Sequence, residues 1–272
     1  MQRTILITGS TDGIGLQTAK DLIAQGHRVV LHGRNRQKAN DAARMLGAAG
    51  AIAFDLGKRA EVVTAAEQLA TLGVGRGELD SVVHNAGVFL TQFALDEHGI
   101  EATLAINHLG PALLTHHLLP HLRRPGARLV FVASVAHTRG QMHWDDFTLQ
   151  SRYGEGYPAY ARSKLANVLF ASALARRLDP VQVTSNSLHP GVVSTKLLRQ
   201  GFGMEGPDSL QEGAATSVLL AASPQVAGKT GLYFARKQAV GEAPHARDLK
   251  EQQRLWDWTQ QALGLAADSW QT

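Results

Sequence analysis

Short apolar runs rich in β-branched residues alternate with longer Ala- and Leu-rich stretches along almost the whole chain. The runs are continuously apolar, a pattern typical of strands that are covered on both faces. The stretches between them are long enough for the crossover helices that parallel strands require. Strands are predicted at residues 5–8, 29–32, 51–54, 81–84, 128–133, 183–188 and 231–234. Helices are predicted at residues 13–25, 36–46, 59–72, 99–122, 157–178 and 209–222.

This alternation predicts an α/β fold with a doubly wound, Rossmann-type parallel sheet of about seven strands. No second pattern, tandem repeat or low-complexity linker interrupts it, so residues 1–272 are expected to form a single domain. A further helix is expected at residues 249–263, with Leu249, Trp256 and Leu263 on its apolar face.

Composition excludes several classes of function. Cysteine is absent, so disulfides, cysteine-ligated metals and a cysteine nucleophile are excluded. The 27 Lys and Arg residues are scattered among 23 Asp and Glu without a long basic run, so no nucleic-acid partner is expected. No apolar stretch reaches the ~18 residues of a membrane span and a strand pattern begins at Thr4, so we expect a soluble, cytoplasmic protein. His117 and His121 lie one helical turn apart, but no further ligands accompany them, so no metal site is expected.

A glycine-rich turn follows the first predicted strand and opens the first predicted helix. Its spacing is GxxxGxG, and its backbone N–H groups and the helix N-terminus could bind a pyrophosphate. A purely structural turn is the alternative interpretation. The expected cofactor contacts are Gly9, Ser10, Thr11, Gly13, Ile14 and Gly15.

The second strand ends at Arg34, where an acidic residue would bind the ribose hydroxyls of NAD. An arginine can instead form a charge-assisted contact with a 2′-phosphate, so NADP(H) is favoured and NAD(H) remains possible. Arg36 could share this role, and a merely exposed arginine is the alternative.

Later strand ends supply further candidates for cofactor binding. Asp55 could accept from the adenine amino group or could form a turn or helix cap, and Leu56 follows it. Small residues after the fourth strand allow close approach of the ribose, and Asn85 could brace neighbouring strands. The remaining candidates are Ala86, Gly87, Pro190, Gly191, Val193 and Thr195.

The strongest catalytic pattern is a tyrosine four residues before a lysine. Tyr160 and Lys164 share one face of a predicted helix, and a nearby ammonium is expected to lower the tyrosine pKa. Ser134 ends the fifth strand and could stabilise charge on a substrate oxygen. Asn107 lies within a long predicted helix, where it could hold a water and extend a proton path from Lys164. An incidental surface pair, a backbone-bonded serine and a helix-kink asparagine are the alternatives.

Two long connections, residues 138–156 and 197–207, are expected to contact substrate. Their aromatic residues Trp144, Phe147 and Phe202 suggest an apolar or aromatic substrate.

In this order, the glycine turn, Asn85-Ala86-Gly87, Asn107, Ser134, Tyr160 with Lys164, and Pro190-Gly191 resemble the short-chain dehydrogenase/reductase family over nearly the whole chain. The resemblance implies a seven-stranded Rossmann fold, a nicotinamide dinucleotide, an Asn-Ser-Tyr-Lys catalytic tetrad, and dimers or tetramers formed through two long helices. A closer likeness is to the retinol dehydrogenase-like and protochlorophyllide-reductase-like branch. It rests on Asn107-His108-Leu109-Gly110, Ser163-Lys164-Leu165-Ala166-Asn167 and His189-Pro190-Gly191-Val192-Val193.

The expected function is therefore NADP(H)-dependent hydride transfer between nicotinamide and a carbonyl or alcohol of an apolar small molecule. Tyr160 is expected to be the acid–base group, with Ser134, Lys164 and Asn107 in support. The alternatives are a non-catalytic NADP-binding sensor or scaffold of the same fold, and a nucleotide-sugar epimerase or dehydratase, which usually has a larger C-terminal substrate domain.

Overall fold

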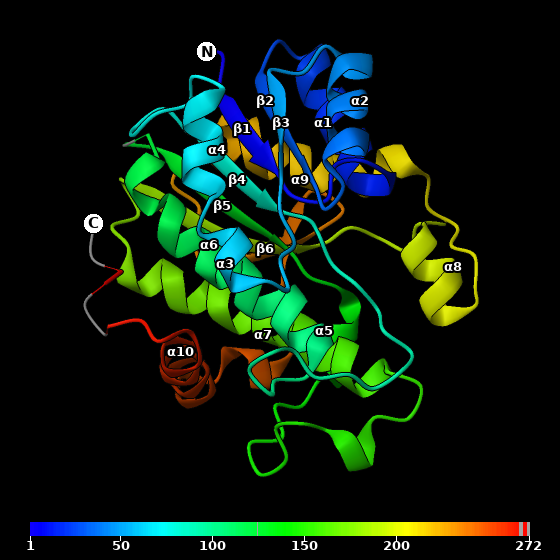
Figure 1. Cartoon of the computed structure of the whole chain (residues 1–272). Coiled ribbons are helices and arrows are strands. Elements are labelled where there is room, and N and C mark those ends of the chain that lie inside the picture. Colours follow the sequence, from blue (N-terminus) through cyan, green and yellow to red (C-terminus); the bar gives the residue numbers. More distant parts are fainter. Residues whose placement is uncertain (124, 267–268, 271–272) are drawn as a thin grey trace.

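The apolar runs form one eight-stranded sheet in the order β3-β2-β1-β4-β5-β6-β7-β8, seen in the computed structural model (Figure 1). The structure describes residues 1–123, 125–266 and 269–270. Strands β1 to β7 are parallel, and the order reverses between β1 and β4. The strands are β1 (Thr4–Ile7), β2 (Arg28–Gly33), β3 (Gly50–Ala53), β4 (Ser81–His84), β5 (Ala127–Val132), β6 (Val183–His189), β7 (Tyr233–Ala235) and β8 (Gln238–Val240).

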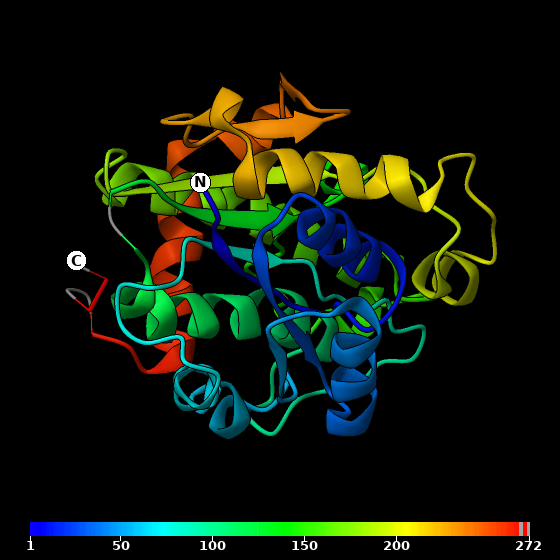
Figure 2. The same cartoon turned by 90° about the horizontal axis from the view of Figure 1, so that it is seen from above.

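Helices cover both faces of the sheet, as the continuous apolar character of the strands requires (Figures 1 and 2). One face carries α1 (Gly13–Ala24), α2 (Arg36–Leu46) and α9 (Leu210–Ala222). The other carries α3 (Arg59–Val62), α4 (Ala65–Thr71), α6 (Gly110–Leu118) and α7 (Tyr157–Arg177). The short helix α8 (Lys196–Phe202) lies at the edge of the molecule in both views. The predicted α/β doubly wound fold is confirmed.

The eighth strand is an addition to the predicted parallel sheet of about seven strands. Strand β8 pairs antiparallel with β7 through a two-residue turn, in which Arg236 and Lys237 have φ of 48° and 65°. Such hairpin turns usually carry Asn-Gly or Asp-Gly, because both positions need positive φ. The pair Arg-Lys lacks that pattern, so this hairpin could not be predicted from its turn residues.

Two predicted helices are interrupted. Residues 59–72 form α3 and α4, which are separated at Val63 and Thr64. The Thr64 hydroxyl donates to the Glu61 carbonyl at 2.7 Å, and β-branched residues here weaken the helix. Residues 99–122 form α5 (Ala102–Leu104), a π-helical turn (Ala105–Leu109), α6 and a final 3₁₀ turn. Pro111 has no N–H to donate to the carbonyl of Asn107, which favours the wider turn around Asn107.

The C-terminal helix α10 (Leu249–Leu263) has the predicted bounds and packs against α7 (Figure 1). Trp256 is buried and stacks on Phe170 with ring centroids 5.6 Å apart. Leu249 is 63% exposed, so its predicted place on the apolar face is wrong. Because α10 lies on α7, the C-terminal helix of the chain covers part of the surface of α7.

A buried ion pair connects α7 to the segment before the π-helical turn. The Arg162 guanidinium donates to Glu101 at 3.2 Å and to the Phe147 carbonyl at 2.7 Å. The Glu101 carboxylate also accepts from the N–H groups of Thr103 and Leu104 at 2.6 and 3.0 Å, which caps α5. Neither charged side chain is exposed, so each depends on the other for compensation of its charge.

We expect Arg162→Met to lower the free energy of unfolding by roughly 3–5 kcal/mol, because it leaves the Glu101 carboxylate buried without its partner. The matched control is Arg199→Met, since the pair of Arg199 with Glu205 is exposed and should contribute little to stability. Urea denaturation of both variants measures the difference, and equal losses would contradict this account.

Candidate active site

Two adjoining cavities open where β1, β4, β5 and β6 end. The first has a volume of about 360 Å³ and the second about 430 Å³. Both are lined by Ile14, Asn85, Gly87, Thr195 and Leu197, so they meet at the point where the strand order reverses. In open α/β sheets this is the usual position of a ligand.

Most of the predicted cofactor residues line these cavities. Those around the first cavity are Gly9, Thr11, Gly13, Ile14, Gly15, Arg34, Asp55, Leu56, Asn85, Ala86, Gly87 and Thr195. Those around the second include Tyr160, Lys164, Pro190, Gly191 and Val193. Ser10 is the exception. Its side chain is buried, donates to the Ile7 carbonyl at 2.8 Å and accepts from His32 N–H at 2.9 Å, so its place among the cavity contacts is wrong.

The glycine turn is shaped for a close ligand. Gly9 has φ of +63°, and a Cβ there would lie 2.8 Å from the Ala86 Cα, so only glycine fits. Gly13, with φ of +56°, begins α1, whose N-terminus borders the first cavity. Free N–H groups and the positive end of the helix dipole suit a pyrophosphate.

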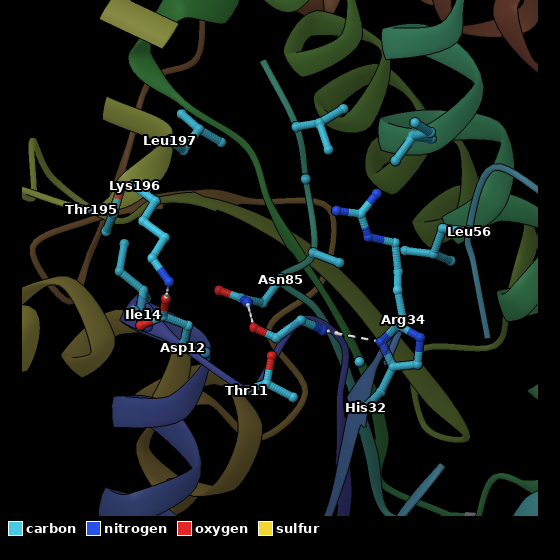
Figure 3. Close-up of a pocket in the computed structure, with 18 of the residues that line it drawn as sticks. Thr11, Asp12, Ile14, His32, Arg34, Leu56, Asn85, Thr195, Lys196 and Leu197 are labelled. Atoms are coloured by element: carbon cyan, nitrogen blue, oxygen red, sulfur yellow. Dashed lines mark hydrogen bonds and ion pairs between the residues drawn. The ribbon is translucent and has the colours of Figure 1, made fainter. Parts of the chain in front are cut away.

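Asn85 and Thr8 join the ends of β1 and β4 beside this turn. The Asn85 amide donates to the Thr8 carbonyl at 2.9 Å and to the Gly9 carbonyl at 3.1 Å, and the second bond is drawn in Figure 3. The Thr8 hydroxyl accepts from the N–H groups of Asn85 and Ala86, each at 3.0 Å. Where the strand order reverses, these side-chain hydrogen bonds therefore hold the ends of β1 and β4 together beyond the last backbone hydrogen bonds between the two strands.

His32, which we did not predict, supports the turn from the end of β2. Its Nδ1 accepts from Gly9 N–H at 3.1 Å (Figure 3), and its Nε2 donates to the Phe54 carbonyl at 3.0 Å. Burial lowers the His32 pKa to about 4, so the ring is neutral in neutral solution, as both bonds require. A histidine at the end of an apolar strand gave no indication of this role.

At the end of β2 the first cavity is lined by an exposed cation, Arg34, beside Leu56 (Figure 3). Asp55 lies in the same cavity, and its Oδ1 accepts from Gly57 N–H at 2.9 Å, which is the turn role that the sequence left open. Arg36 donates to Gln68 at 3.1 Å and is absent from the cavity lining.

The first cavity has a second cation, Lys196, which the sequence did not lead us to predict. Lys196 lines the first cavity and forms an ion pair with Asp12 across the opening between α8 and the glycine turn (Figure 3). Asp12 caps α1 by accepting from Gly13 N–H at 2.8 Å, and the hydrogen bond from Lys196 is the main cause of its lowered pKa. The position of Lys196 next to Thr195 in sequence was the available indication.

The second cavity brings Tyr160, Ser134 and Lys164 together. The Tyr160 and Ser134 side chains both line this cavity, and an interaction with Ser134 is one of the influences on the Tyr160 pKa. The ammonium of Lys164 lies 5.6 Å from the centroid of the Tyr160 ring and donates to the Val132 carbonyl at 3.0 Å. The hydroxyls of Tyr160 and Ser134 thus lie among one face of α7 and the ends of β5 and β6.

Burial dominates the ionisation of both groups on α7. It raises the pKa of Tyr160 to about 12, and the interaction with Ser134 only partly opposes this. It lowers the pKa of Lys164 to about 8. The predicted lowering of the tyrosine pKa is therefore wrong for the chain by itself, because removal from water outweighs the ammonium, whose nearest bonded partner is a backbone carbonyl.

Asn107 is bound to protein at both ends of its amide. Its Oδ1 accepts from Val88 N–H at 2.7 Å, and its Nδ2 donates to the Val88 carbonyl at 2.9 Å and to the Ser163 hydroxyl at 3.0 Å. A Cβ on Gly87 would lie 3.2 Å from the Lys164 Nζ and 3.4 Å from the Asn107 Oδ1, so the missing side chain leaves space between the two. The water-linked path through Asn107 remains a prediction.

The two predicted substrate loops differ. Residues 197–207 place Leu197, Leu198, Phe202 and Met204 around the second cavity. In residues 138–156, only Thr138 and Arg139 reach it. Phe147 packs on Trp258 with centroids 4.3 Å apart, and Trp144 packs on Phe147, so these two aromatics belong to the core around α10 and not to the cavity.

A glycine turn at a helix N-terminus beside a tyrosine–serine pair is the arrangement of a dinucleotide-dependent oxidoreductase. The family model described as short chain dehydrogenase matches residues 3–205. The chain belongs to the short-chain dehydrogenase family, as the sequence blocks predicted.

Known relatives extend this result. Retinol dehydrogenase 14 of Homo sapiens is 34% identical over 292 residues, which cover 97% of this chain and 87% of that protein. Short-chain dehydrogenase TIC 32 B, chloroplastic, of Brassica napus is 35% identical, with 94% and 87% covered. The crystal structure of a putative uncharacterized protein from Mycobacterium Paratuberculosis superposes with a TM-score of 0.80 at 30% identity, with 97% and 94% covered. The chain is an oxidoreductase of the retinol dehydrogenase-like branch, acting on CH–OH or C=O groups.

Among the helices of the described residues, none combines the length and the apolar character that crossing a bilayer would need.

We expect Lys164→Met to raise the free energy of unfolding of the cofactor-free protein at pH 7 by on the order of 1–3 kcal/mol, because it removes a buried charge. Since the folded pKa of Lys164 is lowered from 10.5 to about 8, the cost of its charge is full below pH 8 and declines as the pH rises toward 10.5. The advantage of the variant should therefore shrink between pH 7 and pH 10 in denaturation experiments.

The matched control is Lys20→Met, which replaces an exposed lysine and should change little at either pH. A Lys164→Met protein that is less stable than the parent at pH 7 would show that the bond to Val132 matters more than the buried charge.

Proposed function

We propose that this chain is an NADP(H)-dependent oxidoreductase that interconverts the carbonyl and alcohol forms of apolar small molecules, with Tyr160 as the proton donor and acceptor. One observation carries the proposal. Tyr160, Ser134 and Lys164 together line a largely apolar cavity that adjoins the glycine turn. A protein that only binds NADP, as a scaffold or sensor, would not require Tyr160 and Ser134 at this cavity.

The first cavity fits a nicotinamide dinucleotide. The N-terminus of α1 and the glycine turn suit its pyrophosphate, and Arg34 at the end of β2 suits a 2′-phosphate where an NAD enzyme usually has an acid. Lys164, Pro190, Gly191, Val193 and Thr195 lie on the side shared with the second cavity, where a nicotinamide ring would lie. When bound, the dinucleotide supplies or accepts the hydride.

The residues of the chain would handle the oxygen of the substrate. Ser134 can donate a hydrogen bond as negative charge develops on that oxygen. Tyr160, protonated throughout the neutral range, can transfer its proton to the same atom in reduction. Leu197, Leu198 and Phe202 line the cavity and exclude water from the reacting groups.

We expect Tyr160→Phe to reduce kcat roughly 10²–10⁴-fold, because it removes the proton donor and leaves the ring in place. The measurement is NADPH consumption in a screen of ketones, aldehydes and quinones, with NADPH binding followed by fluorescence. Binding should stay within about twofold of the parent. Full turnover by this variant with any accepted substrate would refute the role of Tyr160.

We expect Arg34→Ala to weaken NADPH binding by roughly 10- to 100-fold and NADH binding by much less, since charge-assisted hydrogen bonds contribute ~1.5–3 kcal/mol. Arg36→Ala is the matched control, because Arg36 is bound to Gln68 outside the cavity lining and should leave both affinities nearly unchanged. An equal loss of both cofactors on replacing Arg34 would argue against a 2′-phosphate site.

A further inference from the structure

The peptide group between Ser134 and Val135 is bound by two histidine rings that come from different parts of the chain. The His137 Nδ1 lies 2.7 Å from the Ser134 carbonyl oxygen. The His189 Nδ1 accepts from Val135 N–H at 3.3 Å. One ring therefore contacts the oxygen of this peptide group and the other its hydrogen.

The hydrogen-bond partners determine the tautomer of each ring. Ala243 N–H donates to the Nε2 of His137 at 3.2 Å, so the proton of this neutral ring is on Nδ1, from which it donates to Ser134. His189 accepts on Nδ1 and so carries its proton on Nε2. Burial lowers the pKa of both rings, that of His189 to about 4, so both are neutral in neutral solution.

No strand is available to orient this peptide group. The β5–β6 ladder ends at Val132, and the last backbone bond toward β6 runs from Ala133 N–H to the Leu188 carbonyl at 2.8 Å. Beyond it, Ser134 begins a 3₁₀ turn (Val135–Arg139), with its hydroxyl accepting from Ala136 N–H at 3.2 Å. Within that turn, His137 N–H also donates to the Ser134 carbonyl, at 3.1 Å.

These contacts restrain the position of Ser134. The serine Cα belongs to the peptide group that the two rings bind, so loss of either contact would let this Cα, and the Oγ that it carries, shift relative to Tyr160. His189 lines the second cavity at the end of β6, next to Pro190 and Gly191, and thus couples the position of Ser134 to the strand end that borders the nicotinamide side.

We propose that His137 and His189 are positioning residues that hold the Ser134 hydroxyl against Tyr160 for the reaction. This inference rests on the proposed function, in which Ser134 binds the oxygen of the substrate. Neither ring needs to touch the substrate or to exchange a proton during turnover.

The test is a double-mutant cycle with a ketone that the parent enzyme reduces. His189→Leu should lower kcat roughly 10- to 100-fold through misplacement of Ser134, while KM and the Kd for NADPH change by less than about threefold. In combination with Ser134→Ala, the same histidine replacement should cause no further loss. His189→Asn offers an amide acceptor at the position of Nδ1 and should restore most of the activity.

His137→Gln gives an independent second variant, because it keeps an acceptor for Ala243 N–H and removes the donor to Ser134. It should also lower kcat only when Ser134 is present, and circular dichroism would confirm folding of each variant.

Additive losses in the cycle, or a loss of NADPH binding that matches the loss of kcat, would overturn the inference and leave the proposed function intact. If Ser134→Ala turns over at the parental rate, both this inference and the proposed role of Ser134 fail. Retained activity in Tyr160→Phe would instead reject the proposed function at its proton donor.

Discussion

Parallel strands that end at one edge leave backbone polar groups there without strand partners, and the rest of this site depends on how they are satisfied. A buried N–H or C=O without a partner costs about as much as a lost hydrogen bond. Here side chains provide the partners: Asn85 for the carbonyls after β1, His32 for Gly9 N–H, and Lys164 for the carbonyl of Val132. The polar side chains gather at this edge because the backbone requires them there, and the two cavities open between them.

The side chains that bond the backbone at this sheet edge are therefore also ones that we propose to bind the ligand. The Lys164 ammonium uses one proton on Val132 and has two left for a ligand. The Asn107 amide bonds both Val88 and α7, and both of its N–H donors are used in these bonds. Loss of activity in a variant at such a position does not by itself distinguish chemistry from folding. Separate readouts of cofactor binding, stability and kcat are needed because the sheet edge and the site share these bonds.

Sequence reasoning succeeded where the information is local. Strand–helix alternation, the glycine turn and the Tyr160–Lys164 spacing each depend on neighbouring residues, and the fold and family follow from them. Sequence reasoning failed where a contact with a distant part of the chain determines where a side chain packs. Phe147 looked like a substrate contact in a polar loop, but Trp258, more than a hundred residues later, packs against it. The π-helical turn could have been anticipated, since Pro111 follows Asn107 by four residues and cannot complete an α-helical bond.

The tyrosine pKa shows what a spacing pattern leaves out. The pattern at Tyr160 and Lys164 places a cation near a phenol, and in water that would favour the phenolate. In the folded chain both groups are buried, and burial disfavours each charged form, so the phenol keeps its proton and the lysine binds its own less tightly. A protonated phenol is the state that can donate a proton to a forming alkoxide. Burial therefore keeps Tyr160, in the chain alone, in the form that the proposed reduction step requires.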